Sequence, residues 1–588
     1  MRENDILFFN LHRRYLNYQP SYGGFLGIYM LAAFLNKNGY AAQSYAGSLV
    51  EGKQLIDEAC QNQKVGMIDL YCDYENVTEN MFLCRYIKET YGIPVVCGGP
   101  QATALGKEFF EKSHCDAVGV YEGELTVLET VDYFLDGIGE LDQIQGLVFY
   151  RDGELVHTPL RPVIQNLDAL PFIDSECYLV PERQRYNELS IMTGRGCPFH
   201  CAFCHEGSHT RQVRFRSIPN VLQEIDLFLD KLPPQGEAYV MFTDDTFTLQ
   251  PQRVKELCGE LKKRQQKKRF NWFCEGHVHM LYTHPEMIQY IADGGAQRLQ
   301  LGIEAGTQEV LDAYRKGSTL DEIRTVVAAC RDAGIEQIFS NIILAGAHYS
   351  RDVYEKNIAF AKELISLGKG CVEIGVVSFW PLAQTSMTLH PEAYDLRIID
   401  DQFLTACGDF PQVETKDLTR WDILRMVRDM SLELRAHMVG MLRRNEVPRK
   451  LIFSWFPQEG SSRAQGQWWQ ILTAEEELCS YYAMLHTGEA VSSDELSIDM
   501  LEAHPMRVLA LDHNTTVIDN GTMEIKGCRL TGLERDVLIL ATGKLSVQDM
   551  LAYIAEHQQI PNDEALRKFV VTTLQKLESY HLVVFSLY

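Results

Sequence analysis

Short apolar stretches alternate with longer amphipathic ones along two regions of this chain, residues 1–150 and residues 187–395. Strand-like segments that alternate with helix-like segments predict parallel sheets covered by helices, so the chain is expected to be of the α/β class. In the first region we expect a doubly wound parallel sheet, whose ligands would bind at the carboxyl ends of the strands. Its expected strands are Ile6–Phe9, Val65–Leu70, Pro94–Cys97 and Ala117–Val120.

The second region has six strand-like segments with helical stretches between them. Six βα units are the number expected for a partial (β/α)6 TIM barrel, in which functional groups lie on the loops at the carboxyl ends of the strands. The expected strands are Leu189–Met192, Ala238–Phe242, Phe270–Cys274, Arg298–Gly302, Gln337–Ile343 and Val372–Val377.

The rest of the chain divides into three further regions. Residues 151–186 are expected to form a linker, with a short hairpin where it begins, because Arg151-Asp-Gly153 has the composition of a tight turn. Residues 396–504 are expected to be mostly helical. Residues 505–588 combine short strands with three helices, for which Ser546 and Asp563 are the expected N-caps, and they predict a small winged-helix-like domain. The expected strands of this domain are Arg507–Leu511, Thr516–Ile518, Thr522–Ile525 and Leu582–Phe585.

Cys197, Cys201 and Cys204 form a C-x3-C-x2-C loop directly after the first expected barrel strand. Three soft thiolates suit an iron–sulfur cluster, and three ligands leave one iron of a [4Fe–4S] cube open. An open iron can chelate an amine and a carboxylate of a small molecule. A structural zinc site is the alternative, with His200 or His205 as fourth ligand. A disulfide is disfavoured because three is an odd number and the chain shows no export signal.

Composition and charge narrow the possible cofactors, partners and location of the protein. The other cysteines among the sixteen are scattered, and Cys407, Cys479 and Cys528 stand isolated, so one cluster is expected. The net charge of −25 disfavours nucleic-acid binding. No signal peptide and no stretch of roughly 18 apolar residues is apparent, which favours the cytoplasm over a membrane. The basic run 262–269 is expected to be a solvated helix end; the alternative is a patch for an acidic peptide or an electron donor.

Several stretches together resemble the cobalamin-binding-domain radical S-adenosylmethionine (SAM) family, over roughly residues 1–395. They include the lead-in Gly194-Arg-Gly196 and the cysteine loop itself. The other matching stretches are Tyr22–Ala33, Gly98-Gly-Pro-Gln-Ala-Thr103, Tyr121-Glu-Gly-Glu124, Leu167–Phe172, Thr243-Asp-Asp-Thr-Phe247 and Gly302-Ile-Glu-Ala-Gly306.

This resemblance implies a fold, cofactors and site residues. The three cysteines would hold the cluster, one SAM would methylate cobalamin, and a second would yield the radical that abstracts a substrate hydrogen. Phe203 would lie near adenine, and Asp244, Asp245 and Glu304 would contact SAM; the two aspartates as N-caps, or Glu304 as a structural residue, are the alternatives. The implied cobalamin contacts are Gly98, Gly99, Pro100, Gln101, Thr103, Glu122 and Glu124.

The sequence also departs from the family pattern. Gln101 stands where the family usually has histidine, and no Asp-x-His-x-x-Gly motif occurs, so no protein histidine is offered to cobalt. Ala345–Tyr349 replaces the expected Pro-Gly-Glu-Thr, which puts any role for that glutamate in doubt. No general base can be named.

The tail resembles the PqqD-type element that recognises the leader of a ribosomally made precursor peptide by strand addition. The alternative, a nucleic-acid-binding winged helix, would need a basic face, and the tail helices are acidic instead. The leading hypothesis is therefore cobalamin-dependent C-methylation of a precursor peptide, with an electron donor such as flavodoxin or ferredoxin. The alternatives are a non-methylating peptide modification with an empty cobalamin domain, and a catalytically silent peptide-binding protein.

Overall fold

The computed structural model describes residues 4–12, 26–62, 65–73, 76–101, 105–181, 186–205, 212–233, 236–399, 411–457, 465–512, 514–519 and 521–586. The chain divides into two compact units. The first consists of Met1–Leu364, Ile374–Ser431 and Gly460–Arg463, and the second of Ile365–Glu373, Leu432–Glu459 and Ala464–Tyr588. Both the cysteine loop and the glycine-rich turn at residues 98–101 belong to the first unit, so the candidate site is built within it.

The first unit begins with a seven-stranded sheet in the order β2-β1-β3-β4-β5-β6-β7. The first five of these strands are parallel, as expected for a doubly wound sheet, and β6 and β7 add an antiparallel edge. The strands are β1 (Asn4–His12), β2 (Ala42–Ser48), β3 (Val65–Tyr71), β4 (Val95–Gly98), β5 (Ala117–Gly119), β6 (Leu147–Arg151) and β7 (Glu154–His157).

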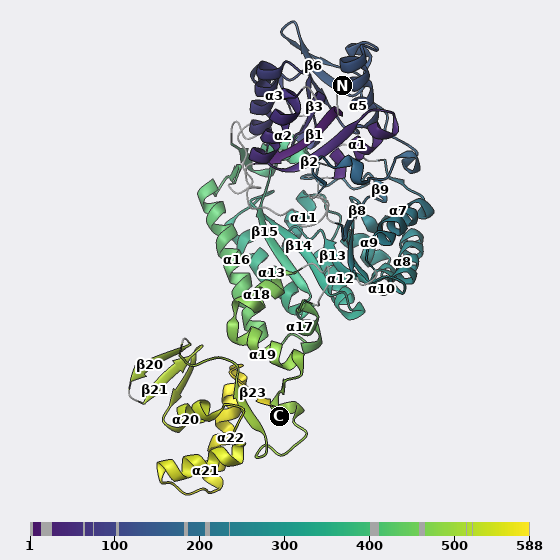
Figure 1. The fold of residues 1–588 in the computed structure, drawn as a ribbon. Coiled ribbons are helices and arrows are strands. Elements are labelled where there is room, and N and C mark those ends of the chain that lie inside the picture. Colours follow the sequence, from purple (N-terminus) through teal and green to yellow (C-terminus); the bar gives the residue numbers. More distant parts are fainter. Residues whose placement is uncertain are drawn as a thin grey trace. The chain divides into compact units, whose positions relative to one another are not determined.

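Helices cover both faces of this sheet (Figure 1). Helices α1 (Leu26–Lys37) and α5 (Glu124–Val131) pack on one face, and α2 (Leu49–Gln61), α3 (Val77–Tyr91) and α4 (Lys107–Ser113) pack on the other. Strand β3 shows why both faces are covered: Ile68 and Leu70 belong to the core on the α2–α4 side, whereas Met67 and Tyr71 lie on the α1/α5 side. Buried strands of parallel sheets are apolar on both faces for this reason.

Two differences from the sequence prediction concern this sheet. The prediction missed β2, whose residues Ala42-Gln-Ser-Tyr-Ala-Gly-Ser48 include no run of branched apolar side chains. It also assigned the hairpin around Arg151-Asp-Gly153 to the start of a linker, but β6 pairs with β5 and the hairpin extends the sheet.

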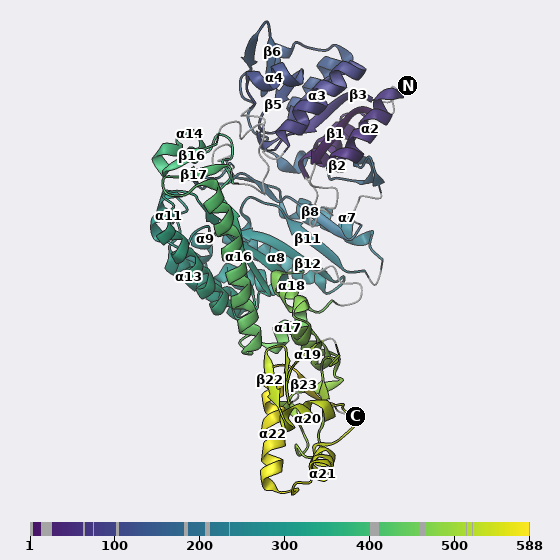
Figure 2. The same ribbon diagram turned by 90° about the vertical axis from the view of Figure 1, so that its left-hand side faces the viewer.

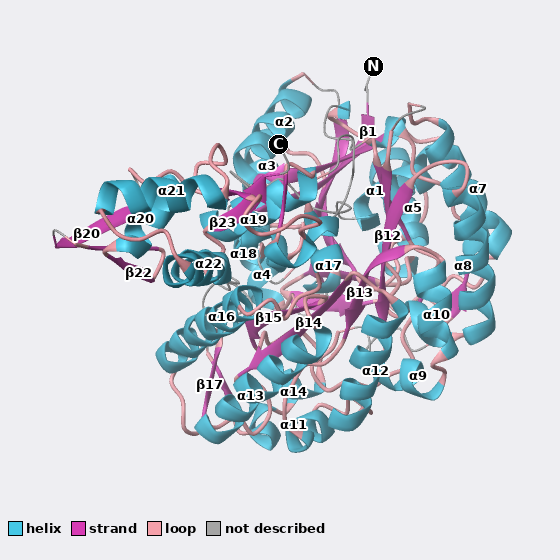
Figure 3. Cartoon of the chain, turned by 90° about the horizontal axis from the view of Figure 1, so that it is seen from below, coloured by secondary structure: helices cyan, strands magenta, loops and turns pink. Residues whose placement is uncertain are grey.

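A six-stranded sheet in the order β15-β14-β13-β12-β11-β8 forms the barrel region. All six predicted strands are confirmed, as β8 (Glu188–Ile191), β11 (Ala238–Phe242), β12 (Phe270–Gly276), β13 (Ala296–Leu301), β14 (Gln337–Leu344) and β15 (Val372–Ser378). The helices α8 (Pro251–Gln265), α10 (Glu286–Asp293), α12 (Leu320–Ala333) and α13 (Arg351–Gly368) lie in an arc outside the strands (Figure 3). Shorter helices α7 (Ile218–Asp230), α9 (Val278–Thr283), α11 (Gln308–Ala313) and α14 (Ser386–Leu389) complete the region.

The basic run 262–269 lies at the C-terminal end of α8 and just beyond it. Lys263 pairs with Glu260, and Arg264 pairs with Asp226 at 2.7 Å. These contacts favour the interpretation of the run as a helix end, where cations interact well with the last carbonyl groups.

The second unit includes the C-terminal half of the long helix α16 (Arg420–Arg443), followed by α17 (Arg449–Trp455), α18 (Gln467–Ala474) and α19 (Glu476–Thr487). It ends in two three-stranded sheets, β18-β23-β19 and β20-β21-β22. Their strands are β18 (Ala490–Val491), β19 (His504–Arg507), β20 (Thr515–Asp519), β21 (Thr522–Ile525), β22 (Cys528–Thr531) and β23 (Val583–Ser586). Helices α20 (Leu533–Leu540), α21 (Val547–Gln558) and α22 (Glu564–Ser579) pack with them around one apolar core (Figure 2).

The tail confirms its three predicted helices and both N-caps, because the Ser546 hydroxyl accepts from the Asp549 N–H and the Asp563 carboxylate accepts from two N–H groups of α22. The first predicted strand, Arg507–Leu511, is displaced to His504–Arg507, and β22 was missed. Strand β18 pairs with β23, so the sheet also reaches back before residue 505. Among the helices in the described ranges, none is both long and apolar enough to cross a membrane.

Candidate functional site

The cysteine loop starts at the carboxyl end of β8 and is closed at its base by a two-stranded ribbon. In this ribbon β9 (Gly194–Arg195) pairs antiparallel with β10 (Arg214–Phe215). Further along the loop, the Ala202 N–H donates to the Tyr314 carbonyl at 2.8 Å, and the Met387 N–H donates to the Ala202 carbonyl at 3.1 Å. Backbone bonds therefore fix the loop on both sides of Cys197, Cys201 and Cys204, at the barrel end where functional groups are expected.

The three cysteines are partly exposed. Cys197 Sγ lies 3.7 Å from Thr246 Oγ1. Burial raises the pKa of the Cys197 and Cys201 thiols, and the Lys316 ammonium acts in the opposite direction on both. Soft sulfur donors in one loop fit an iron–sulfur cluster, whose iron would take the thiolate form.

Asp244 and Asp245 follow β11, and their carboxylates accept hydrogen bonds from the residues just before the cysteine loop. Asp244 is 4% exposed, and its two oxygens accept hydrogen bonds from the Thr193 N–H and hydroxyl, each at 2.5 Å. Asp245 Oδ2 accepts from the Gly196 N–H at 2.9 Å. The observed role of both carboxylates is thus to anchor the residues just before Cys197. A direct contact of either one with SAM stays a prediction.

Glu304 lies after β13 in a left-handed backbone conformation, with φ of 64°, and pairs with a lysine that the sequence analysis did not single out. Lys316 Nζ donates to Glu304 Oε1 at 3.0 Å, and both side chains are largely buried. Burial alone would lower the pKa of Lys316, but Glu304 and the thiols of Cys201 and Cys204 raise it. A Cβ at residue 302 would collide with Lys316 Nζ, so Gly302 leaves the space for this pair.

Aromatic rings pack on the cysteine loop. Phe203 meets Tyr314 edge-on, with ring centroids 5.1 Å apart, and Lys316 Nζ lies 5.8 Å from the Phe203 centroid. Phe199 stacks on His277 at 3.7 Å. Burial, reinforced by Lys316, lowers the pKa of His277 to about 3, so this imidazole is neutral at physiological pH. The structure places Phe203 beside the Glu304–Lys316 pair; its packing near adenine stays a prediction.

A cavity of about 390 Å³ opens at the carboxyl ends of β3, β4 and β5. Of the predicted cobalamin contacts, Gly98, Gly99, Pro100, Glu122 and Glu124 line it. Gln101 is 2% exposed, its N–H donates to the Cys72 carbonyl, and it is not part of the lining. Thr103 lies outside the described residues. Arg195, Gly196 and Asp245 line the same cavity, which therefore shares a wall with the cysteine loop.

The two glycines of the turn serve different purposes. Gly99 has a φ of 109°, and a Cβ there would come within 2.6 Å of the Cys72 carbonyl oxygen. This position therefore requires glycine for the turn itself. A Cβ at Gly98, in contrast, would have no atom within 4 Å, although Gly98 lines the cavity. Gly98 thus keeps ligand space open.

Glu122 and Glu124 are bound by arginines from the base of the cysteine loop. Arg195 pairs with Glu124 at 2.5 Å and with Glu122 at 3.4 Å, and Arg214 pairs with Glu122 at 2.8 Å. All four side chains are at most 14% exposed. Burial would raise the pKa of Glu122, but its hydrogen bonds to Arg214 and to the Ile164 N–H, together with the positive charge of Arg195, lower it. We call these four residues the arginine clamp, because they join the glycine-lined cavity to the cysteine loop.

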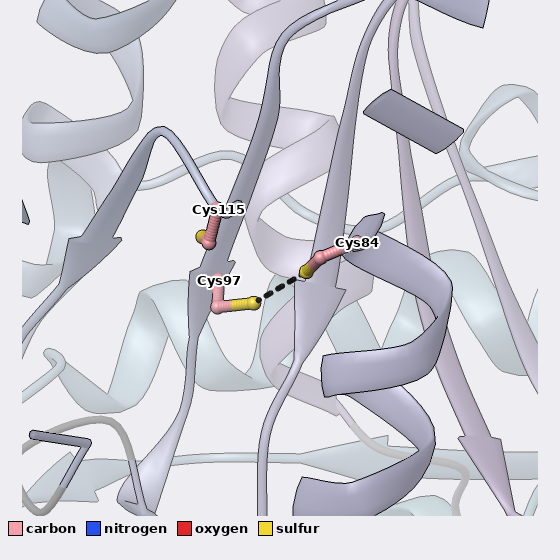
Figure 4. A group of neighbouring side chains, drawn as sticks. All are labelled: Cys84, Cys97 and Cys115. Atoms are coloured by element: carbon pink, nitrogen blue, oxygen red, sulfur yellow. Dashed lines mark hydrogen bonds between the residues drawn. The ribbon is translucent and has the colours of Figure 1, made fainter. Parts of the chain in front are cut away.

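The fold also gathers three cysteines that are scattered in the sequence. The Sγ atoms of Cys84, Cys97 and Cys115 lie within 4.8 Å of one another, with Cys84 and Cys97 at 3.6 Å (Figure 4). All three are buried in the apolar core on the α2–α4 side of the sheet. Cys115 Sγ faces the Val95 and Ala117 carbonyl oxygens, and burial raises the pKa of Cys84. Against the effect of its burial, bonds from Cys84 and Cys97 lower the pKa of Cys115, but the apolar surroundings favour packing of this group in the core over binding of a metal ion.

Comparison with known proteins agrees with this geometry. Residues 191–360 match the family model of the radical SAM superfamily. An uncharacterized methyltransferase of Pyrococcus horikoshii is 30% identical over 295 residues, which are 49% of this chain and 60% of that protein. The radical SAM methyltransferase TsrM from Kitasatospora setae, solved with cobalamin and a [4Fe–4S] cluster, superposes with a TM-score of 0.59 at 14% identity, over 82% of this chain and 100% of that one.

A second solved structure has the same fold. The cobalamin-dependent SAM radical enzyme OxsB, solved with aqua-cobalamin, has a TM-score of 0.58 at 16% identity, over 98% of this chain and 84% of that one. The superfamily match contains the cysteine loop and therefore supports the iron–sulfur interpretation over structural zinc. Residues 191–360 of this chain form a radical SAM domain, in an α/β fold shared with cobalamin-dependent radical SAM enzymes.

Proposed function

We propose that the chain is a radical SAM methyltransferase with one [4Fe–4S] cluster, SAM and cobalamin, and that it methylates a ribosomally made precursor peptide at carbon. One observation carries the cofactor part of this proposal: the glycine-lined cavity and the cysteine loop share the wall formed by Arg195, Gly196 and Asp245. A methyl carrier in the cavity would then be adjacent to the radical source in the barrel. A low-potential electron donor such as flavodoxin or ferredoxin would reduce the cluster.

The residues of this chain would have the following roles toward the cluster and SAM. Cys197, Cys201 and Cys204 would hold three irons and leave the fourth for the amine and carboxylate of SAM. The Glu304–Lys316 pair and Phe203 would border the bound SAM. When bound, the cluster supplies the electron that cleaves SAM, and cobalamin supplies the methyl group. Assaying the reconstituted enzyme with precursor peptide for 5′-deoxyadenosine and for a mass gain of one methyl group tests the proposal.

Filling the cavity should block cobalamin. Gly98→Leu is expected to abolish retention of hydroxocobalamin through gel filtration, because the added side chain would enter open ligand space without touching protein atoms. Gly106→Leu is the matched control, since Gly106 is equally open but outside the cavity lining. Visible absorbance of the eluted protein measures retention. If wild-type protein retains no cobalamin, methylation is excluded and a non-methylating peptide modification becomes the better candidate.

The precursor peptide is proposed to bind the second unit through its leader. Strand β20 is an edge of the sheet β20-β21-β22, and its Val517 and Ile518 are 76% and 44% exposed. An edge strand with exposed apolar side chains offers both unpaired main-chain groups and side-chain contacts to an added strand. At the opposite edge, in contrast, the carbonyl of Arg529 in β22 already accepts a hydrogen bond from Lys576. These features favour β20 as the docking edge for the leader.

Charges at this edge should weaken leader binding. Val517→Asp combined with Ile518→Asp is expected to lower the affinity for a fluorescent leader peptide by about tenfold, because burying two apolar side chains against the leader stabilises the complex by roughly 1–2 kcal/mol. SAM cleavage without substrate should stay at the wild-type rate. Val50→Asp, at an exposed valine of α2 in the first unit, is the control. Unchanged leader affinity in the double variant would argue against β20, and no leader binding by the wild type would remove the peptide substrate class.

A further inference from the structure

Glu275, on β12, is a carboxyl group of the barrel for which the proposed chemistry has no role so far. Helices cover the outer face of the barrel strands (Figure 3), so side chains that stay partly exposed belong to the inner face. Cys274, the residue before it, is 0% exposed, whereas Glu275 is partly exposed. The carboxyl group of Glu275 therefore faces the interior of the barrel.

The strand register places further polar side chains beside Glu275 on this inner face. Glu275 is paired with Gln300 on β13, and Gln300 is paired with Phe339 on β14. Asn341 lies two positions after Phe339 and therefore faces the same way. All four residues are partly exposed. Within the described part of the chain, the side chains of Glu275, Gln300 and Asn341 have no hydrogen bond or ion pair, so their polar groups are available to a ligand that enters the barrel.

The charges around Glu275 favour a cationic ligand. Burial, together with the negative charges of Asp245 and Glu304, raises the pKa of Glu275 to about 7, and Asp244 acts in the same direction. Lys316 lowers this pKa, but its ammonium group is already paired with Glu304 at 3.0 Å. Glu275 thus has no cation of its own, and a positively charged ligand would stabilise its ionised form.

The available acceptors indicate which kind of cation fits. The carboxylate of Glu275 and the side-chain carbonyl oxygens of Gln300 and Asn341 are three acceptor groups on one face. An ammonium group has three donors and no acceptor, which matches this set. Two ligands could bring an ammonium group into the barrel, SAM and a lysine side chain of the substrate. In the proposed function the amino group of SAM binds the open iron, which leaves the substrate.

We propose that Glu275 is a specificity residue that binds the ammonium group of a lysine side chain in the substrate, with Gln300 and Asn341 as further hydrogen-bond acceptors. The inference rests on the proposed function and deepens it, because it names the class of residue that the substrate presents to the barrel. It requires binding of a lysine side chain to depend on Glu275, while binding of SAM does not.

Two blocked amino acids test this requirement, Nα-acetyl-lysine amide and Nα-acetyl-norleucine amide, because norleucine has the carbon chain of lysine without the ammonium group. We expect the protein loaded with cluster and SAM to bind the lysine probe about tenfold more tightly than the norleucine probe. Glu275→Gln should remove this difference, and Gln300→Leu should reduce it. Glu256→Gln, at an exposed glutamate of α8, is the control. Equilibrium dialysis measures the affinities, and iron content and circular dichroism report that each variant is folded.

The pH dependence gives a second readout. Wild-type affinity for the lysine probe should rise as pH rises through about 7, because Glu275 then loses its proton while the lysine ammonium keeps its own. Glu275→Gln should show no such rise. Equal affinity of wild type and Glu275→Gln for the lysine probe would overturn the role of Glu275. A loss of SAM affinity in Glu275→Gln, with binding of the lysine probe unchanged, would assign the ammonium group to SAM and overturn the substrate assignment.

Failure of this inference and failure of the proposed function give different results. Wild-type protein that forms 5′-deoxyadenosine with a reductant but binds both probes equally would refute the lysine preference alone. Wild-type protein that prefers the lysine probe in a manner dependent on Glu275, but forms no 5′-deoxyadenosine, would refute the proposed function and leave the binding preference in place.

Discussion

Replacing Cys197, Cys201 and Cys204 together by alanine is expected to remove all of the iron and to leave a folded protein. Thiolates are the ligands of a [4Fe–4S] cluster, so wild-type protein after anaerobic reconstitution should carry about four irons per chain. The loop itself is held by backbone bonds at Ala202 and by the aspartates after β11, none of which involves a cysteine side chain. Iron analysis and the visible charge-transfer absorbance measure the loss, and circular dichroism measures the fold.

The buried cysteine group provides the matched control. Changing Cys84, Cys97 and Cys115 to alanine should lower stability, because three buried sulfur atoms are removed from the core. It should leave the iron content at the wild-type level. If this second triple variant loses iron and the first one keeps it, the assignment of the cluster to the C-x3-C-x2-C loop is wrong.

The fold was largely predictable because its strands are signalled locally. The barrel strands are short segments that contain apolar residues and alternate with amphipathic helices, and all six were found within a few residues. The missed strands β2 and β22 lack that signal. Strand β22, Cys528-Arg-Leu-Thr531, alternates buried and exposed residues, but it is only four residues long and follows a tight turn after β21. Its identity comes from pairing with β21, which a local pattern does not encode.

Residues of the candidate site could be proposed from the sequence to the extent that they form motifs. The cysteines, Gly98 and Glu304 could be named because each lies in a short characteristic run. Lys316 and Arg195 were missed for a different reason. Their roles come from partners far along the chain, Glu304 for Lys316 and Glu124 for Arg195.

Breaking the arginine clamp should have the largest effect on stability. Arg195→Met would leave Glu124, whose side chain is 3% exposed, without the cation that compensates its charge. Removing one partner of a buried pair costs roughly 3–5 kcal/mol because a buried charge is left uncompensated. We expect the free energy of unfolding, measured by urea denaturation of the cluster-free protein, to fall by this amount. Iron retention should fall as well, because Arg195 lies in the ribbon that closes the base of the cysteine loop.

Two further variants show whether the loss comes from the buried charge. Adding Glu124→Gln to Arg195→Met should recover part of the stability, because the uncompensated carboxylate is then gone and the two changes are not additive. Arg324→Met breaks an exposed pair with Glu363, in which the side chains are 36% and 47% exposed, and should cost less than about 1 kcal/mol. If Arg195→Met lowered the free energy of unfolding no more than Arg324→Met does, the clamp would not be a stabilising link between the cavity and the cysteine loop. The same conclusion would follow if the double variant lost as much free energy of unfolding as Arg195→Met and Glu124→Gln lose separately.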